Sequence, residues 1–132
     1  MKQDQNWLAE MESRRQDDEP SPGQEMAALM RRTDEVLKGL SPEDGAELRE
    51  LSAGWRELVL AGYALSCGYA PHAADGVGEL LTAAPEGAAW RAENLRLTRA
   101  AEALADTVPE VLPLSDRWDD LCTLALVLGQ RR

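Results

Sequence analysis

The single histidine and the polar residues near it are the first candidates for chemistry. Cys67, His72 and Asp75 could supply a nucleophile, a general base and a carboxylate that orients the base. The segment that joins them crosses the expected end of a helix and contains Pro71, so the spacing does not fix their relative geometry. A histidine in an exposed loop explains the same residues, and we expect no catalytic site here.

Four carboxylates crowd the start of a predicted helix and raise the question of a metal site. Carboxylates one helical turn apart can share a metal ion, and di-metal sites in helical bundles combine such pairs with Glu-x-x-His motifs. A chain with one histidine cannot supply two of these motifs. We therefore expect the acids to interact with the positive end of the helix dipole, and we predict no metal and no cofactor. The residues are Glu43, Asp44, Glu47 and Glu50.

A short glycine-rich stretch, Gly76-Val77-Gly78, contains part of the pattern of a dinucleotide-binding loop. It follows no predicted strand and lacks the third glycine of that pattern. The chain also has no P-loop, no CxxC pair and no serine-centred nucleophile elbow. The sequence therefore favours a protein that is not an enzyme.

The charge balance narrows the range of partners. The chain has 132 residues, of which 24 are acidic and 14 are Lys or Arg, and its formal net charge is -10. Binding to the phosphates of nucleic acid requires a basic surface, so we expect neither nucleic acid nor an anionic membrane as a partner. A strongly acidic surface keeps a protein in solution and favours basic partners.

Nothing in the sequence predicts export or membrane insertion. The N-terminal residues contain no apolar segment typical of a signal peptide. The longest uncharged run is interrupted by Gly68 and Pro71 and is shorter than the roughly 20 residues that span a bilayer. Cys67 and Cys122 lie in apolar helical contexts and are expected to be free thiols. We therefore expect a cytoplasmic protein, and its arginine and alanine content suggests a bacterial or phage origin.

The residues from Ser41 to Gly68 form the clearest predicted helix. Ser41 can cap its N-terminus, and Pro42 suits the first helical position, where a missing N–H has no cost. Gly54 and Gly62 weaken a helix, and close packing of a neighbouring helix is the expected compensation. Apolar positions recur at steps of three and four, the period of a helix with one buried face. They are Leu48, Leu51, Trp55, Leu58, Val59, Gly62 and Leu65.

Three further helices complete the predicted bundle. One should cover residues 22–39 and form an antiparallel hairpin with the central helix, because the connection between them is very short. Another should cover residues 85–108. Two prolines within residues 108–114 predict an extended connector, after which Ser115 caps a final helix. We therefore predict an all-α fold, a compact bundle of four main helices with a short N-terminal helical arm.

The N-terminal arm differs in composition from the rest of the chain. Residues 1–21 are mostly polar and should form an arm and linker, whereas residues 22–132 should form the bundle domain. The arm has one apolar cluster, formed by Trp7, Leu8 and Met11. Either this cluster packs loosely in a frayed helix, or it anchors the arm in a groove of this protein or of a partner.

The sequence favours a non-enzymatic protein-interaction module: an adaptor, regulator or inhibitor that could also self-associate as a homodimer. The last helix is apolar on nearly all sides, which is more apolar surface than a small monomer needs. The residues expected to bind the partner are Trp118, Leu121, Leu124 and Leu128, followed by Trp7, Leu8 and Met11.

Two other functions remain open from the sequence. A small-ligand sensor would hold its ligand in an apolar pocket between helices, close to the largest aromatic side chains. An inhibitor of phage type would present an acidic surface to a basic nucleic-acid-binding protein. The residues expected around the ligand pocket are Trp55, Tyr63, Tyr69 and Trp90.

Overall fold

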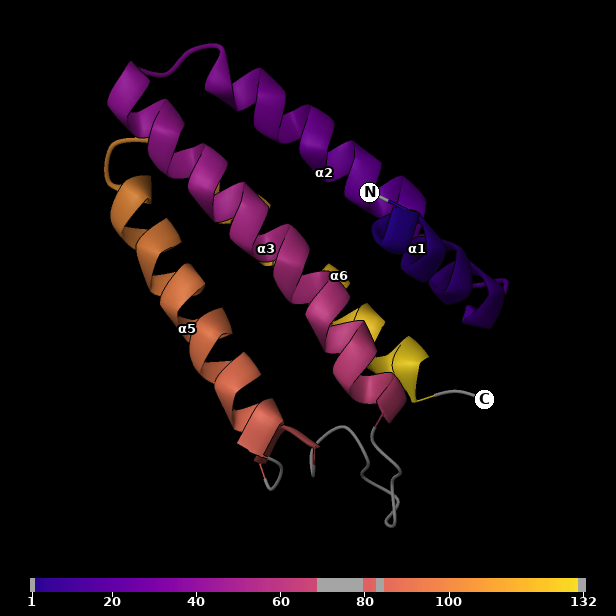
Figure 1. The fold of residues 1–132 in the computed structure, drawn as a ribbon. Helices are drawn as coiled ribbons and strands as arrows, with labels where there is room; N and C mark the ends of the chain where they lie inside the picture. Colours follow the sequence, from indigo (N-terminus) through magenta and orange to yellow (C-terminus); the bar gives the residue numbers. More distant parts are fainter. Residues whose placement is uncertain (1, 69–79, 83–84, 131–132) are drawn as a thin grey trace.

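The computed structural model describes residues 2–68, 80–82 and 85–130, and every regular element within them is helical (Figure 1). The elements are α1 (Lys2–Arg14), α2 (Pro22–Leu37), α3 (Pro42–Gly68), α5 (Pro85–Ala105) and α6 (Val111–Gly129), with one further helical turn at 80–82. The predicted all-α fold, with four main helices and a short N-terminal helical arm, is confirmed.

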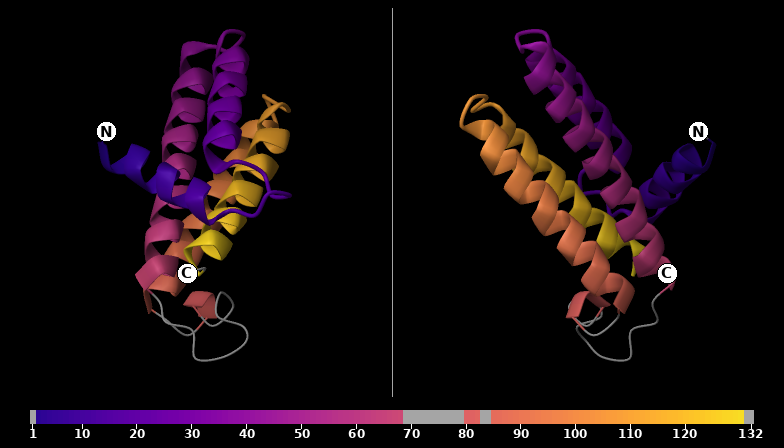
Figure 2. Two further views of the ribbon diagram at one scale, coloured as in Figure 1. Left: turned by 90° about the vertical axis from the view of Figure 1, so that its right-hand side faces the viewer. Right: turned by 60° about the vertical axis from the view of Figure 1, so that its left-hand side comes forward.

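α3 is the central helix of the bundle. It packs most extensively against α6 and next against α5, while α2 contacts both α3 and α6. In Figure 1, α3 lies in front of α6, with α2 on one side and α5 on the other. The right-hand view of Figure 2 shows the α2–α3 and α5–α6 hairpins as two pairs that diverge toward their connecting turns.

The start of each helix in the α2–α3 hairpin is specified by a Ser-Pro pair. Ser41 Oγ accepts a hydrogen bond from the Asp44 backbone N–H at 3.2 Å, and Pro42 is the first residue of α3. Ser21 caps α2 in the same way, and Pro22 follows it. Both helix starts therefore have a local chemical cause that the sequence shows.

The glycines of α3 let α5 approach closely, as predicted. A Cβ atom on Gly54 would lie 2.9 Å from Leu97 Cδ2. A Cβ atom on Gly62 would lie 3.1 Å from Trp90 Nε1, and this indole N–H donates to the Leu58 carbonyl at 2.8 Å. The packing offsets the cost of each glycine inside a helix, about 1 kcal/mol relative to alanine.

α3 and α6 meet along a tightly packed seam. The rings of Trp55 and Trp118 stack, with centroids 6.2 Å apart and planes inclined by 19°. Farther along, a Cβ atom on Gly129 would lie only 2.6 Å from Ser66 Cβ. Ser66 Oγ donates to the Leu126 carbonyl at 2.5 Å, so a side chain of α3 is also hydrogen-bonded to the backbone of α6.

The start of α6 differs from the prediction. The sequence predicts an extended connector through residues 108–114 and a cap at Ser115, but α6 begins at Val111. Pro113 is compatible with the helix because it lies in the first turn, where backbone N–H groups have no intrahelical partner. Glu110 precedes the helix without a side-chain capping bond, and Ser115 is a buried residue within it.

α1 lies across the bundle and packs against α2, α3 and α6 (Figure 2). Met11 is completely buried, at 0% exposure, and belongs to the same core as the other helices. Trp7 and Leu8 are partly buried against that core. The apolar cluster of the arm therefore docks on this chain itself.

Two charged residues of α1 contact the ends of other helices. The Glu12 carboxylate accepts hydrogen bonds from Ser21 Oγ and, at 3.1 Å, from the Gly23 backbone N–H at the start of α2. The Arg14 guanidinium donates to the Gly129 carbonyl at 3.2 Å, at the end of α6. An anion at a helix N-terminus and a cation at a C-terminus are both favourable, so α1 stabilises two helix ends at once.

Candidate functional site

Of the three residues that could form a catalytic set, the structure describes only Cys67. It is exposed at the end of α3, and the Arg14 guanidinium lies 3.3 Å from its Sγ. His72 and Asp75 lie outside the described residues, as does the glycine-rich stretch 76–78. The expectation that these residues form no catalytic site therefore stays a prediction.

The second cysteine has a different environment. Cys122 is buried in α6, and burial, with a smaller contribution from the nearby Asp119, raises the pKa of its thiol to about 12. The thiol of Cys122 is therefore protonated at neutral pH, which makes it a poor nucleophile.

The four acids considered as metal ligands lie in the first turns of α3. Glu43, Glu47 and Glu50 are exposed, and Asp44 is partly exposed. Within the described ranges, no group of three or more His, Cys, Asp or Glu side chains is arranged to hold a metal ion. The position of Glu43 and Asp44 in the first turn suits an interaction with the helix dipole.

Three of the four α6 residues expected at a partner interface lie in the core. Trp118 and Leu128 are completely buried, and Leu121 is nearly so. Leu124 is partly buried against the same core. The apolar character of α6 is thus explained by packing within this chain. The assignment of these residues to a partner interface stays a prediction.

The aromatic residues expected around a ligand pocket fill the space between helices. Trp55, Tyr63 and Trp90 are all buried. The Tyr63 hydroxyl is 3.3 Å from Glu10 Oε2, so its polar atom is directed toward α1. Tyr69 lies outside the described residues. The hollows described next are lined by other side chains.

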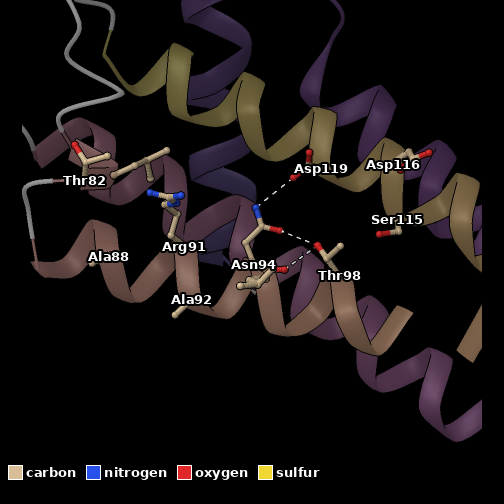
Figure 3. A pocket seen from close by; sticks show the side chains of 11 residues that line it. Thr82, Ala88, Arg91, Ala92, Asn94, Thr98, Ser115, Asp116 and Asp119 are labelled. Atoms are coloured by element: carbon tan, nitrogen blue, oxygen red, sulfur yellow. Dashed lines mark hydrogen bonds between the residues drawn. The ribbon is translucent and has the colours of Figure 1, made fainter. Parts of the chain in front are cut away.

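A hollow of about 580 Å³ lies between α5 and α6 (Figure 3). A second hollow, of about 460 Å³, continues from it, because both are lined by Thr98, Ser115 and Asp116. Together they form one groove along the hairpin, which we call the α5–α6 groove. Its lining residues are Leu81, Thr82, Ala88, Arg91, Ala92, Asn94, Leu95, Thr98, Glu102, Ala105, Asp106, Leu112, Ser115, Asp116 and Asp119.

One hydrogen bond connects the two walls of the α5–α6 groove. Asn94 Nδ2 of α5 donates to Asp119 Oδ1 of α6 at 3.2 Å. Thr98 Oγ1 donates to the Asn94 carbonyl at 2.9 Å and so adds a second bond on the α5 side. Figure 3 shows this network in the middle of the groove, with Arg91 on one side of it and Asp116 on the other. The Asn94–Asp119 bond therefore links α5 to α6 at this point of the groove.

The α5–α6 groove is acidic. Four carboxylates line it, from Glu102, Asp106, Asp116 and Asp119, against the one guanidinium of Arg91. The four acids are exposed, and none forms an ion pair with any other described residue. Their charge is therefore available to a ligand or a partner.

Two large apolar side chains are exposed in the α5–α6 groove. Leu95 of α5 is 50% exposed and Leu112 of α6 is 45% exposed. Among the described residues, only Met30 on α2 is another large apolar side chain with comparable exposure. Sequence reasoning missed both leucines. The sequence does contain an indication for Leu95. It lies outside the periodic apolar positions that α5 buries, which include Leu97 and Leu104, so it should face solvent.

Comparison of the chain with protein-family models, with curated proteins and with solved structures gives no match. In the part of the chain that the structure describes, no helix has both the length and the apolar character needed to cross a membrane.

Proposed function

We propose that this chain is a non-enzymatic protein-interaction module that binds a partner through the α5–α6 groove. The observation that carries the proposal is the position of Leu95 and Leu112, which are both exposed and both line this groove. Isolated exposed leucines are ordinary on protein surfaces. Two on the walls of a single groove resemble the exposed apolar sites that partners cover.

The groove offers a moderate apolar contribution to binding. Complete burial of a leucine side chain contributes about 1.5–3 kcal/mol. Leu95 and Leu112 are about half exposed, so covering both would contribute roughly 2 kcal/mol in total. The remaining affinity must come from the surrounding polar and charged groups, which suits a regulated rather than a permanent complex.

The docking of α1 shows how this bundle binds a helix. α1 is held by one completely buried apolar residue, Met11, and by charged contacts from Glu12 to the start of α2 and from Arg14 to the end of α6. The α5–α6 groove also presents apolar side chains together with charged ones. A partner helix would therefore use the same combination of contacts.

The hollow beside the predicted α6 interface supports partner binding less well. Leu121 and Leu124 line a hollow of about 180 Å³ together with Pro20 and Arg117. It is much smaller than the hollows of the α5–α6 groove, and Leu121 contributes little exposed surface to it. We therefore place the partner surface on the α5–α6 hairpin.

Site-specific cross-linking tests this proposal. A photo-reactive residue replaces Leu95 in one variant and Met30 in a control variant, and both proteins are made in the cells that naturally produce the chain. Met30 is matched to Leu95 in exposure but lies on α2. We expect a discrete cross-linked protein from position 95 and none from position 30. Absence of adducts from position 95, together with a strictly monomeric chain in light scattering, would overturn the proposal.

Small-ligand binding is the second candidate function, and the wider part of the groove favours it. A hollow of about 580 Å³ is within the roughly 300–1,000 Å³ of small-molecule sites. Arg91, Asn94 and Thr98 provide polar groups there. A ligand that binds only the folded state must raise the melting temperature. A thermal-shift screen of the wild-type protein, repeated with Leu95→Ser, would therefore reveal a groove ligand as a shift that the variant loses.

A further inference from the structure

We propose that the segment that occupies the α5–α6 groove is a cationic amphipathic helix of the partner protein. This inference rests on the proposed function and adds the chemistry of the partner. Three properties of the groove support it: its length, the arrangement of its apolar side chains and its unpaired negative charge.

The length of the groove fits a helix. Its lining on α5 runs from Ala88 to Ala105, most of the length of that helix. At 1.5 Å per residue, these 18 positions span about 26 Å, the length of a partner helix of about five turns. Small side chains such as Ala92 and Ser115 would let the backbone of such a helix approach closely.

Each helix of the hairpin contributes one exposed leucine to the groove. Leu95 belongs to α5 and lines the wider hollow, and Leu112 belongs to α6 and lines the second hollow. A helix that lies along the groove could cover both with a stripe of apolar residues spaced three and four apart, the usual recognition pattern of a helix in a groove.

The charge of the groove determines the charge of the occupant. Four carboxylates and one guanidinium leave the lining with a formal charge of about -3. Lysine or arginine side chains on the flanks of the occupant would pair with Glu102, Asp106 and Asp116, which form no ion pair with described residues. Arg91 lies on the other side of the hydrogen-bond network from Asp116. There it would form an ion pair with an acidic residue of the occupant, or donate to the backbone carbonyls at the C-terminus of the occupant helix.

The same charge argues against a second copy of this chain as the occupant. Two copies that met groove to groove would bring together two acidic surfaces, and each chain has a net charge of -10. The same negative charge that repels another copy would attract a cationic helix. Complementary charge across an interface also speeds association and helps to select the partner.

A synthetic helix provides the direct test. The probe is a fluorescent peptide of 18 residues made of leucine, alanine and lysine, with the leucines at helical spacing, and binding is followed by fluorescence anisotropy. A peptide of the same composition with the leucines scattered around the helix controls for charge alone. We expect the patterned peptide to bind the wild-type protein at least about tenfold more tightly than the scattered peptide.

Charge-matched variants locate the binding site. Glu102→Gln with Asp116→Asn removes two groove carboxylates, and Glu35→Gln with Asp34→Asn removes the same number and kind from the exposed surface of α2. We expect the groove pair to weaken binding of the patterned peptide by about tenfold, and the α2 pair by less than about twofold. All four residues are exposed, so both variants should fold, and circular dichroism would verify this.

The apolar walls are tested in the same assay. Leu95→Ser with Leu112→Ser should weaken binding at least about tenfold, whereas Met30→Ser should leave it unchanged. Equal weakening by the α2 and groove carboxylate pairs would show binding by overall charge and would overturn the inference. Failure of the peptide to bind, combined with a specific cross-link from position 95, would reject the cationic helix while the proposed function survived. Failure of both experiments would reject both.

Discussion

The face of α6 that meets α3 and the face that lines the α5–α6 groove differ both in their residues and in how they are covered. Toward α3, Trp118 is fully buried against Trp55, and Gly129 leaves no space beside Ser66. Along α5, Leu112 stays exposed at the edge of an open groove. We refer to these two regions as the closed seam and the open groove.

Neighbouring helices, as well as residue type, distinguish the two regions. The closed seam is flanked by α2 and by α1, both of which contact α6. Within the described residues, only the α5–α6 hairpin itself and the turn at 80–82 line the open groove. A closed seam therefore contributes to stability, and an open groove is available for binding. We therefore expect substitutions to change the free energy of unfolding strongly in the closed seam and weakly in the open groove.

The largest effect is expected at the centre of the closed seam. Trp118→Ala should lower the free energy of unfolding by about 3–5 kcal/mol, because it removes a completely buried aromatic ring and its stack on Trp55. Urea unfolding followed by circular dichroism measures the loss. Trp118→Phe should cost clearly less, since the buried indole Nε1 has no hydrogen-bond partner among the described residues. A loss below about 1 kcal/mol for alanine would contradict the closed seam.

A single added methyl group should also disturb the closed seam. Gly129→Ala places a Cβ atom 2.6 Å from Ser66 Cβ and 2.9 Å from the Tyr63 carbonyl oxygen, so α3 and α6 must separate. Overpacking of this kind costs about 1–3 kcal/mol in unfolding free energy. Gly68→Ala is the matched control, because its Cβ meets no atom of the described residues within 4 Å. Equal free energies of unfolding for the two variants would contradict the tight contact between α3 and α6 at Gly129.

The contact of α1 with α2 should depend on pH through Glu12. Burial alone would raise the pKa of Glu12, but hydrogen bonds from Ser21 and Gly23 and the nearby Arg15 lower it below 4.5. The stabilisation is therefore present above about pH 4.5 and is lost as pH falls through the lowered pKa.

Glu12→Gln should reduce the free energy of unfolding at neutral pH by about 1 kcal/mol, a value that allows for the partial exposure of this side chain. The difference from wild type should shrink as pH falls below about 4.5, because the wild-type carboxylate becomes protonated. Chemical denaturation at several pH values measures the trend, with the exposed Glu35→Gln on α2 as a control. A constant difference across pH would show that the Glu12 charge is not responsible.

The smallest stability effect is expected in the open groove. Leu95→Ser and Leu112→Ser should each change the free energy of unfolding by less than about 0.5 kcal/mol, because both side chains are already about half exposed. The same denaturation assay as for Trp118→Ala provides the comparison. A loss above about 2 kcal/mol for either leucine would mean that the open groove belongs to the core after all.

The start of a helix could be predicted from the sequence where its cause lies in neighbouring residues. The starts of α2 and α3 follow from Ser21 and Ser41, each with a proline after it. The start of α6 could not be predicted in this way, because the position of Pro113 in a first turn depends on where the chain meets the bundle. The contacts of Glu12 and Arg14 with other helices are also not visible in the sequence.

The candidate site was harder to predict than the fold, for a physical reason. Apolar periodicity shows which residues share a helix face, but not which neighbour covers that face. Trp118 and Leu128 were therefore assigned to an interface, although α6 buries them within the bundle. Leu95 lies outside the buried stripe of α5, so apolar periodicity does not mark it, and the same position leaves it exposed.

The contrast between the two cysteines gives the chain a built-in attachment point for a fluorescent dye. Cys67 is exposed and Cys122 is buried as a protonated thiol, so a maleimide dye should react at Cys67 alone without any mutation. The Arg14 guanidinium of α1 lies 3.3 Å from Cys67 Sγ. Emission from such a dye would follow in real time whether the N-terminal helix stays seated or lifts away.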